Sequence, residues 1–115
     1  MAEYLVLIYD SEAAWAGASP AEVQRIHEGH GRFGETNRAV IKGGNALQPT
    51  STATTLRPEA SGEITVTDGA FAETKEALGG YYLLEAADLD EAIALARQIP
   101  VIDGSLEIRP IMVFE

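Results

Sequence analysis

The sequence predicts an α+β sandwich in which two helices cover one face of an antiparallel sheet. Three observations support this fold class. Short runs of β-forming residues recur from one end of the chain to the other, two longer segments carry helix caps and an apolar stripe, and a threonine-rich pair of runs flanks a turn. The resulting order is β-α-β-(hairpin)-β-α-β. With right-handed crossovers, this order predicts a ferredoxin-like sandwich with both helices on the same side of the sheet.

The first elements follow from strand-forming residues and a clear helix start. A run of β-formers, Tyr4–Tyr9, is closed by Asp10, and Glu12–Trp15 can add a short helical turn. Ser19 can cap a helix that begins at Pro20. Steps of three and four residues then define one helical face, which we expect to end at Gly43–Gly44. The residues on this face are Val23, Ile26, His27, His30, Phe33, Asn37, Val40 and Ile41.

The second half of the chain repeats the pattern after a hairpin. A capping signal at Asp88 opens a second helix, which Pro100 stops. The other expected elements are a short strand at Asn45–Gln48, a hairpin of Thr52–Leu56 and Glu63–Thr67 across Glu59–Gly62, and strands at Tyr81–Ala86 and Ser105–Phe114.

Both faces of the predicted sheet carry apolar residues, although the two helices can cover only one. The first strand is apolar throughout, and in the last strand we expect Ile111 and Val113 to share the uncovered face with Glu107 and Arg109. A homodimer packed sheet against sheet would bury that second face.

Composition excludes several classes of protein. The 115 residues suit one domain, 1–115, and the 18 acidic against 8 basic residues give a net charge of −10. Such a chain is repelled by nucleic acid and by anionic membranes, so neither partner is expected. There is no cysteine, no basic leader and no apolar run of membrane-spanning length, so we expect a cytoplasmic protein.

Histidine is the first candidate for chemistry. His30 lies on the apolar stripe between Ile26 and Phe33 and is predicted to face the sheet. It is either a core histidine satisfied by one hydrogen bond or a general acid or base, because histidine titrates closest to neutrality. His27 and His30 have a spacing that could bind a metal, but no third ligand is evident, so no metal is predicted. The motifs of phosphate-binding, dinucleotide-binding and zinc sites are absent, and no cofactor is predicted.

The segment from Thr67 to Leu84 contains the other candidates. Asp68-Gly69 is a turn signal that predicts positive φ at Gly69, and Asp68 either accepts local backbone hydrogen bonds or serves a site. Glu73 and Lys75 belong to a charged turn that is either simply solvated or lines a cleft. Arg109 needs a carboxylate partner, either internal or from a ligand.

Several stretches together resemble the YCII-related proteins, most closely the branch named for a D-G-P-F motif. These are Y-L-V-L-I-Y-D, L-Q-P-T-S-T-A-T-T-L-R, V-T-D-G-A-F-A-E-T-K-E-A-L-G-G-Y-Y-L-L, D-L-D-E-A-I and L-E-I-R-P-I-M. Ala70 stands where the motif has proline. The resemblance implies a dimeric α+β barrel and a histidine–aspartate active-site pair, whose counterparts by position are His30 and Asp68. It implies no particular reaction or substrate.

The sequence therefore predicts a small homodimer with a polar cleft near His30, Asp68 and Arg109, with Lys75 and Glu73 at its rim. One hypothesis is an acid–base enzyme acting on a small molecule, including an anionic one. The other is a binding or interaction module without catalysis, because the same fold supports both.

Overall fold

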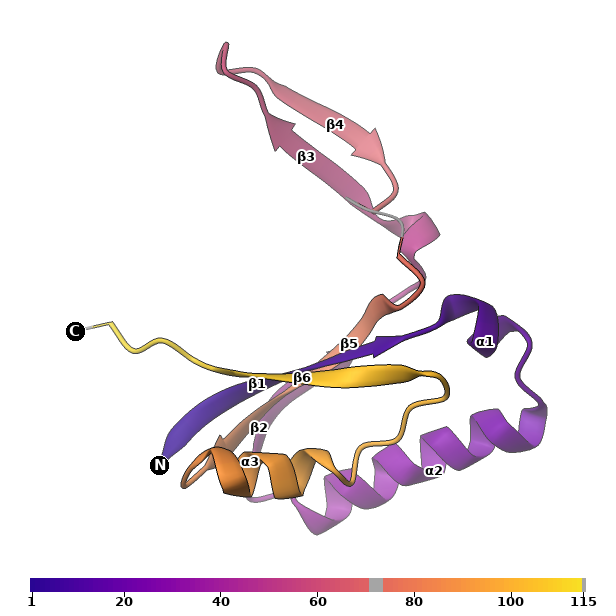
Figure 1. Cartoon of the computed structure of the whole chain (residues 1–115), viewed down its shortest axis with the longest axis vertical. Helices are drawn as coiled ribbons and strands as arrows, with labels where there is room; N and C mark the ends of the chain where they lie inside the picture. The colour runs from indigo at the N-terminus through magenta and orange to yellow at the C-terminus, as the bar shows by residue number, and fades with distance from the viewer. Residues whose placement is uncertain (71–73, 115) are drawn as a thin grey trace.

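A computed structural model of the chain describes residues 1–70 and 74–114 (Figure 1). The elements in chain order are β1 Ala2–Asp10, α1 Glu12–Ala16, α2 Pro20–Thr36, β2 Ile41–Ala46, the 3₁₀ turn η1 Thr50–Thr52, β3 Thr54–Pro58, β4 Ile64–Asp68, β5 Ala77–Ala86, α3 Leu89–Ala96 and β6 Gly104–Pro110. None of the helices in these described ranges is long and apolar enough to cross a membrane.

Four strands form one antiparallel sheet in the order β2-β5-β1-β6, with β1 and β5 at its centre. Helices α2 and α3 lie on one side of this sheet, and no element of the described residues covers its other side, the uncovered face (Figure 1). This strand order and the shared side of the two helices confirm the predicted α+β, ferredoxin-like fold.

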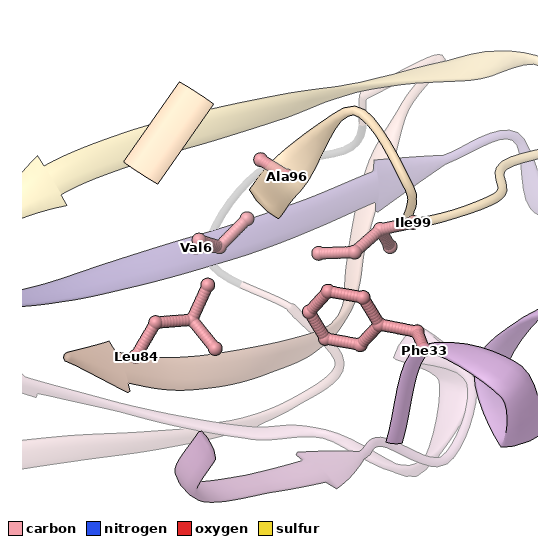
Figure 2. Packing of buried hydrophobic residues seen from close by; sticks show 5 residues of the cluster. All are labelled: Val6, Phe33, Leu84, Ala96 and Ile99. Atoms are coloured by element: carbon pink, nitrogen blue, oxygen red, sulfur yellow. The ribbon is translucent and has the colours of Figure 1, made fainter. Parts of the chain in front are cut away.

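The core lies between the sheet and these two helices (Figure 2). Val6 of β1 and Leu84 of β5 meet Phe33 of α2, and Ala96 and Ile99 close the cluster from the α3 side. The expected caps hold the helices in place. Ser19 Oγ accepts a hydrogen bond from the Glu22 N–H at 3.1 Å, and Asp88 Oδ1 accepts one from the Glu91 N–H at 2.9 Å.

The uncovered face of the sheet has an apolar centre. Residues directly opposite each other in an antiparallel pair share a face, and the register pairs Leu5 with Leu83 and Leu7 with Tyr81. These four side chains are only partly buried in the single chain. On β6 the same face carries Glu107 and Arg109, opposite Leu7 and Leu5.

The β3–β4 hairpin projects away from the sheet and helices (Figure 1). Its two strands contact chiefly each other. Leu56 of β3 pairs with Val66 of β4. The side chains of Leu56, Val66 and Ile64 are 59%, 63% and 56% exposed. At the base of the hairpin, Gly69 has φ +102°, which confirms the predicted positive φ.

The end of the long helix differs from the prediction. We expected it to continue to Gly43–Gly44, but α2 ends at Thr36 and Asn37 caps it, since the Asn37 N–H bonds the Phe33 carbonyl at 3.1 Å. Val40 and Ile41 continue the apolar period of the helix in the sequence, but they belong to the segment that leads into β2. Periodicity alone therefore did not reveal where the helix ends. Gly44 lies inside β2, where a Cβ would come within 2.8 Å of the Tyr81 carbonyl oxygen.

The strand boundaries also differ. The short strand expected at Asn45–Gln48 is β2, Ile41–Ala46, and β5 begins at Ala77 rather than Tyr81. The last strand ends at Pro110 rather than Phe114, because proline has no N–H to continue a ladder. Ile111 still donates a backbone hydrogen bond to Glu3, but Met112, Val113 and Phe114 are 78%, 85% and 87% exposed.

Candidate functional site

An open cavity of about 1000 Å³ lies between α2 and one end of the sheet. Its wall is formed by the end of β1, by α1, by the part of α2 around His27 and His30, by residues 44–51, and by the first half of β5. A smaller adjoining hollow of about 440 Å³ extends under the base of the hairpin, beside Ala53 and Ala70. The larger cavity is at the upper end of the usual range for small-molecule sites, which is roughly 300–1,000 Å³.

His30 and Tyr82 form a hydrogen-bonded pair in the wall of this cavity. His30 Nδ1 lies 2.7 Å from the Tyr82 hydroxyl oxygen, and the direction of the bond follows the histidine tautomer. α2 turns His30 towards the sheet, and Tyr82 is on the helix-facing side of β5 because it is opposite the buried Val6. Phe33 packs on the tyrosine ring at a centroid distance of 4.9 Å, which fixes the ring in place.

Burial keeps both partners of this pair in their neutral forms at pH 7. Desolvation lowers the pKa of His30 from its ordinary value, and the nearby His27 lowers it further by charge repulsion. Desolvation also raises the pKa of the Tyr82 phenol. The site therefore presents a neutral imidazole joined to a protonated hydroxyl.

Asp10, a buried carboxylate at the end of β1, holds the adjoining wall together. Its oxygens accept hydrogen bonds from the backbone N–H groups of Ser11, Ile102 and Asp103 and from the Trp15 indole at 2.8–3.0 Å. Burial would raise the pKa of Asp10, but these hydrogen bonds outweigh it and the pKa is lowered. One charged side chain therefore joins β1, α1 and the segment that leads into β6.

Glu12 links α1 to the 3₁₀ turn at the mouth of the cavity. Its carboxylate accepts hydrogen bonds from the side chain and from the backbone N–H of Thr50, the latter at 2.8 Å. These bonds lower the pKa of Glu12, so the mouth of the cavity carries a negative charge at neutral pH.

The comparisons with known proteins give one family and one curated relative. The model of the YCII-related domain matches residues 2–115. The chain belongs to the YCII-related family. An uncharacterised protein of Rhizobium meliloti (strain 1021) is 38% identical over 120 residues, covering 97% of this chain and 94% of that protein. The match establishes the family, and the finer D-G-P-F branch stays a prediction.

The structure places the two residues suggested by the family resemblance in different parts of the chain. His30 lies in the cavity wall as predicted from its stripe, whereas Asp68 is exposed in β4, opposite Thr54 of β3. In the single chain no hydrogen bond joins these two described side chains, and Tyr82 is the partner of His30. The His30–Asp68 pair stays a prediction.

Among the described candidates, the two cationic side chains do not line the cavity. Arg109 Nε donates to Glu107 Oε1 at 2.8 Å on the uncovered face of the sheet, with 70% of its side chain exposed. Arg109 thus has an internal carboxylate partner, Glu107, which is the first of the two alternatives that the sequence left open. Lys75 is exposed, and neither it nor Arg109 lines the cavity. Glu73 lies outside the described residues. Within the described ranges, no group of three side chains is arranged to hold a metal ion.

Sequence reasoning missed Tyr82 and Asp10. The strand alternation Gly80, Tyr82, Leu84, Ala86 would have placed Tyr82 on the helix-facing side, where His30 was expected to point. Asp10 was interpreted only as the end of the first strand. The four donors that converge on it come from residues 11, 15, 102 and 103, and a single sequence gives no sign that the last two return to β1.

Proposed function

We propose that this YCII-related protein binds a small molecule in the cavity beside α2 and that the His30–Tyr82 pair is the acid–base group of the site. The observation that carries the proposal is the hydrogen bond between these two neutral, titratable side chains in the wall of a large open cavity. Titratable groups with perturbed pKa values in a cavity are typical of functional sites.

The tautomer of His30 determines what the pair can do. With its proton on Nδ1, His30 donates to the Tyr82 oxygen, and Nε2 is left as a free base of pKa below its ordinary range. The phenol hydrogen of Tyr82 is then free to donate to an oxygen or nitrogen of the bound molecule. Nε2 would take a proton from that molecule while Tyr82 stabilises the negative charge that develops.

Binding without catalysis is the second candidate function. It is favoured by the existing bond to Tyr82, which already satisfies one ring nitrogen of His30, and by the mostly apolar wall of the cavity. Both functions place the ligand in the same cavity, and they differ in whether a proton moves.

A fragment screen followed by ¹H–¹⁵N correlation spectra tests the cavity. Trp15 is the chain's one tryptophan and lines the cavity, so its indole N–H signal reports occupancy directly. We expect bound fragments to shift this signal together with the backbone signals of residues 44–51. Ligands that shift only signals outside the cavity wall would contradict the proposal.

Hydrogen–deuterium exchange into the bound molecule separates the two functions. In D₂O, wild-type protein should exchange an acidic C–H of a bound carbonyl compound, and His30→Gln should bind that compound without exchanging it. Binding without exchange by the wild type across a panel of such compounds would support the non-catalytic function instead.

We also propose a homodimer in which the uncovered sheet face is buried, as in a dimeric α+β barrel. The chain exposes 7988 Å², whereas a compact monomer of 12.3 kDa exposes about 6,100 Å². Its radius of gyration is 16.4 Å against about 13 Å for a compact domain of this length. The excess of about 1,900 Å² exceeds the ~800 Å² that each partner buries in a standard interface.

The apolar centre of the uncovered face and the projecting hairpin supply this surplus surface, and a second copy can cover both. Sedimentation equilibrium at micromolar concentration should give twice the mass of the chain. A monomer under those conditions would contradict the dimer.

We also propose that the protein is cytoplasmic, on the sequence evidence of an acidic chain without cysteine.

A further inference from the structure

The charges around the cavity differ in sign from those that an anionic ligand would need. Two carboxylates, Asp10 and Glu12, belong to its wall, and no lysine or arginine does among the described residues that line it. Since the whole chain has a net charge of −10, the surrounding field also repels anions.

The two histidines do not reverse this balance. His30 is half-buried and shares its hydrogen bond with the protonated Tyr82, and burial holds its pKa below the ordinary value, so it is neutral at pH 7. His27 is exposed on α2, where its ring lies 6.3 Å from the ring of Trp15. A ligand carboxylate or phosphate in the cavity would therefore lose water without gaining a cationic partner, which is unfavourable.

The remaining wall suits a molecule with an apolar body. Ile8, Ile26 and Leu78 line the cavity, and two aromatic side chains, Trp15 and Tyr82, contribute flat surfaces. Aromatic faces bind apolar rings, and they attract cations through their negative quadrupole. The His30–Tyr82 pair offers one polar contact on this surface.

We infer that the ligand of this cavity is an uncharged or positively charged molecule with a largely apolar body and one hydrogen-bonding group, and that anions are rejected. This inference rests on the proposed function, because it names the ligand class of the same cavity. It replaces the anionic ligand that Arg109 and Lys75 suggested in the sequence, since neither residue lines the cavity.

Three matched probes test the inference. 1-Naphthaleneacetamide, 2-(1-naphthyl)ethylamine and 1-naphthaleneacetate share one ring system and differ in the charge of a side group at pH 7.5. Affinities are measured by calorimetry, and the Trp15 indole signal confirms that each probe occupies the cavity. We expect the amide and the amine to bind at least about tenfold more tightly than the acetate, which corresponds to ~1.4 kcal/mol.

A designed charge provides the matched variant. Gln48 lines the cavity, so Gln48→Lys places a cation in its wall, whereas Ala94→Lys adds the same charge on the exposed side of α3. Gln48→Lys should strengthen binding of the acetate several-fold relative to the amide, and Ala94→Lys should leave the ratio unchanged.

The outcomes separate the two claims. Equal or tighter binding of the acetate by the wild-type protein overturns the ligand class while the cavity remains a binding site. An equal gain in acetate affinity from Gln48→Lys and Ala94→Lys also overturns it, since the charge of the wall would then have no specific effect. If none of the probes binds at millimolar concentration, the proposed binding function and the ligand class both fail.

Discussion

His30 is the residue whose chemistry depends most on its surroundings. The apolar stripe of α2 carries it towards the sheet, and β5 places the Tyr82 hydroxyl 2.7 Å from its Nδ1. Burial then keeps the ring neutral, because an imidazolium ion is less stable away from water. The same residue could serve as a base or as a satisfied core histidine, and its protonation equilibrium is measurable.

The pKa of His30 should lie below the ordinary histidine value of 6.5, and His27→Gln should raise it partway back. Burial remains in that variant, so the pKa stays below 6.5. Histidine ring signals followed by NMR against pH give both values. Arg38→Gln removes a positive charge beyond the end of α2 and should leave the pKa of His30 unchanged.

The sign of this shift also affects stability. Because the pKa is lower in the folded than in the unfolded chain, the unfolded state takes up the proton first as pH falls below 6.5. Below that pH, His30 therefore lowers the stability of the folded state. Above it, this loss of stability is absent. A His30 that titrates at or above 6.5 in the wild type would contradict this explanation.

Asp10 should be important for stability. Asp10→Asn replaces an oxygen acceptor by an NH₂ group facing backbone donors, and we expect a loss of about 2 kcal/mol in the free energy of unfolding at pH 7. Urea denaturation measures it, with Asp103→Asn as the control, since the Asp103 side chain is exposed and only its backbone bonds Asp10.

The pH dependence of Asp10 has the opposite sign to that of His30. The pKa of Asp10 is lowered on folding, so its stabilisation is present above the ordinary aspartate value of 3.8 and is lost as pH falls through the folded pKa. Asp10→Asn should lack this part of the acid transition. An unchanged denaturation midpoint at pH 7 would show that the carboxylate does not hold these segments together.

At the scale of elements, local signals predicted the caps and the hairpin but not every boundary. Ser19 and Asp88 cap the helices as expected because a cap depends on neighbours within three residues. The end of α2 was missed because Val40 and Ile41 continue its apolar period while belonging to the path into β2. The inward direction of the His30 side chain could likewise be predicted from the apolar stripe of its own helix. Its partner Tyr82 was not predicted, because it lies 52 residues away in the sequence.

The base of the hairpin offers a test at this scale. Gly69 has φ +102°, its N–H bonds the Ala53 carbonyl at 2.6 Å, and a Cβ there would meet no other atom within 4 Å. Gly69→Val should therefore act through backbone strain alone, at about 1–2 kcal/mol.

The effect of Gly69→Val should be local, because β3 and β4 contact chiefly each other. We expect faster hydrogen exchange at the amides of residues 54–57 in β3 and 64–68 in β4, with the amides of β1 and β5 unchanged. Ala70→Val changes the next residue without positive φ and serves as the control. Equal exchange in the two variants would show that the turn tolerates a side chain at Gly69.

At the scale of the whole molecule, the uncovered sheet face is the largest feature that a single chain leaves unexplained. Leu7 is near its centre, opposite Tyr81 on one side and Glu107 on the other. Leu7→Glu should weaken the proposed dimer by at least about 100-fold, because a buried carboxylate without a partner is costly.

Sedimentation velocity across a concentration series measures this effect. Ala94→Glu, on the exposed side of α3, is the matched control and should dimerise as the wild type does. If Leu7→Glu keeps the wild-type dissociation constant, the dimer forms through another surface.

The cavity beside His30 and Tyr82 is the proposed ligand site of this YCII-related protein. The most direct measurement takes a ligand that binds the wild-type protein and determines its affinity for a variant in which the cavity is filled. Ala46 is at the end of β2 in the cavity wall, so Ala46→Trp should occupy the space, while Ala94→Trp adds the same ring on α3. We predict that calorimetry will show binding lost in Ala46→Trp and unchanged in Ala94→Trp, with both variants folded. Wild-type affinity in a folded Ala46→Trp variant would contradict ligand binding in this cavity.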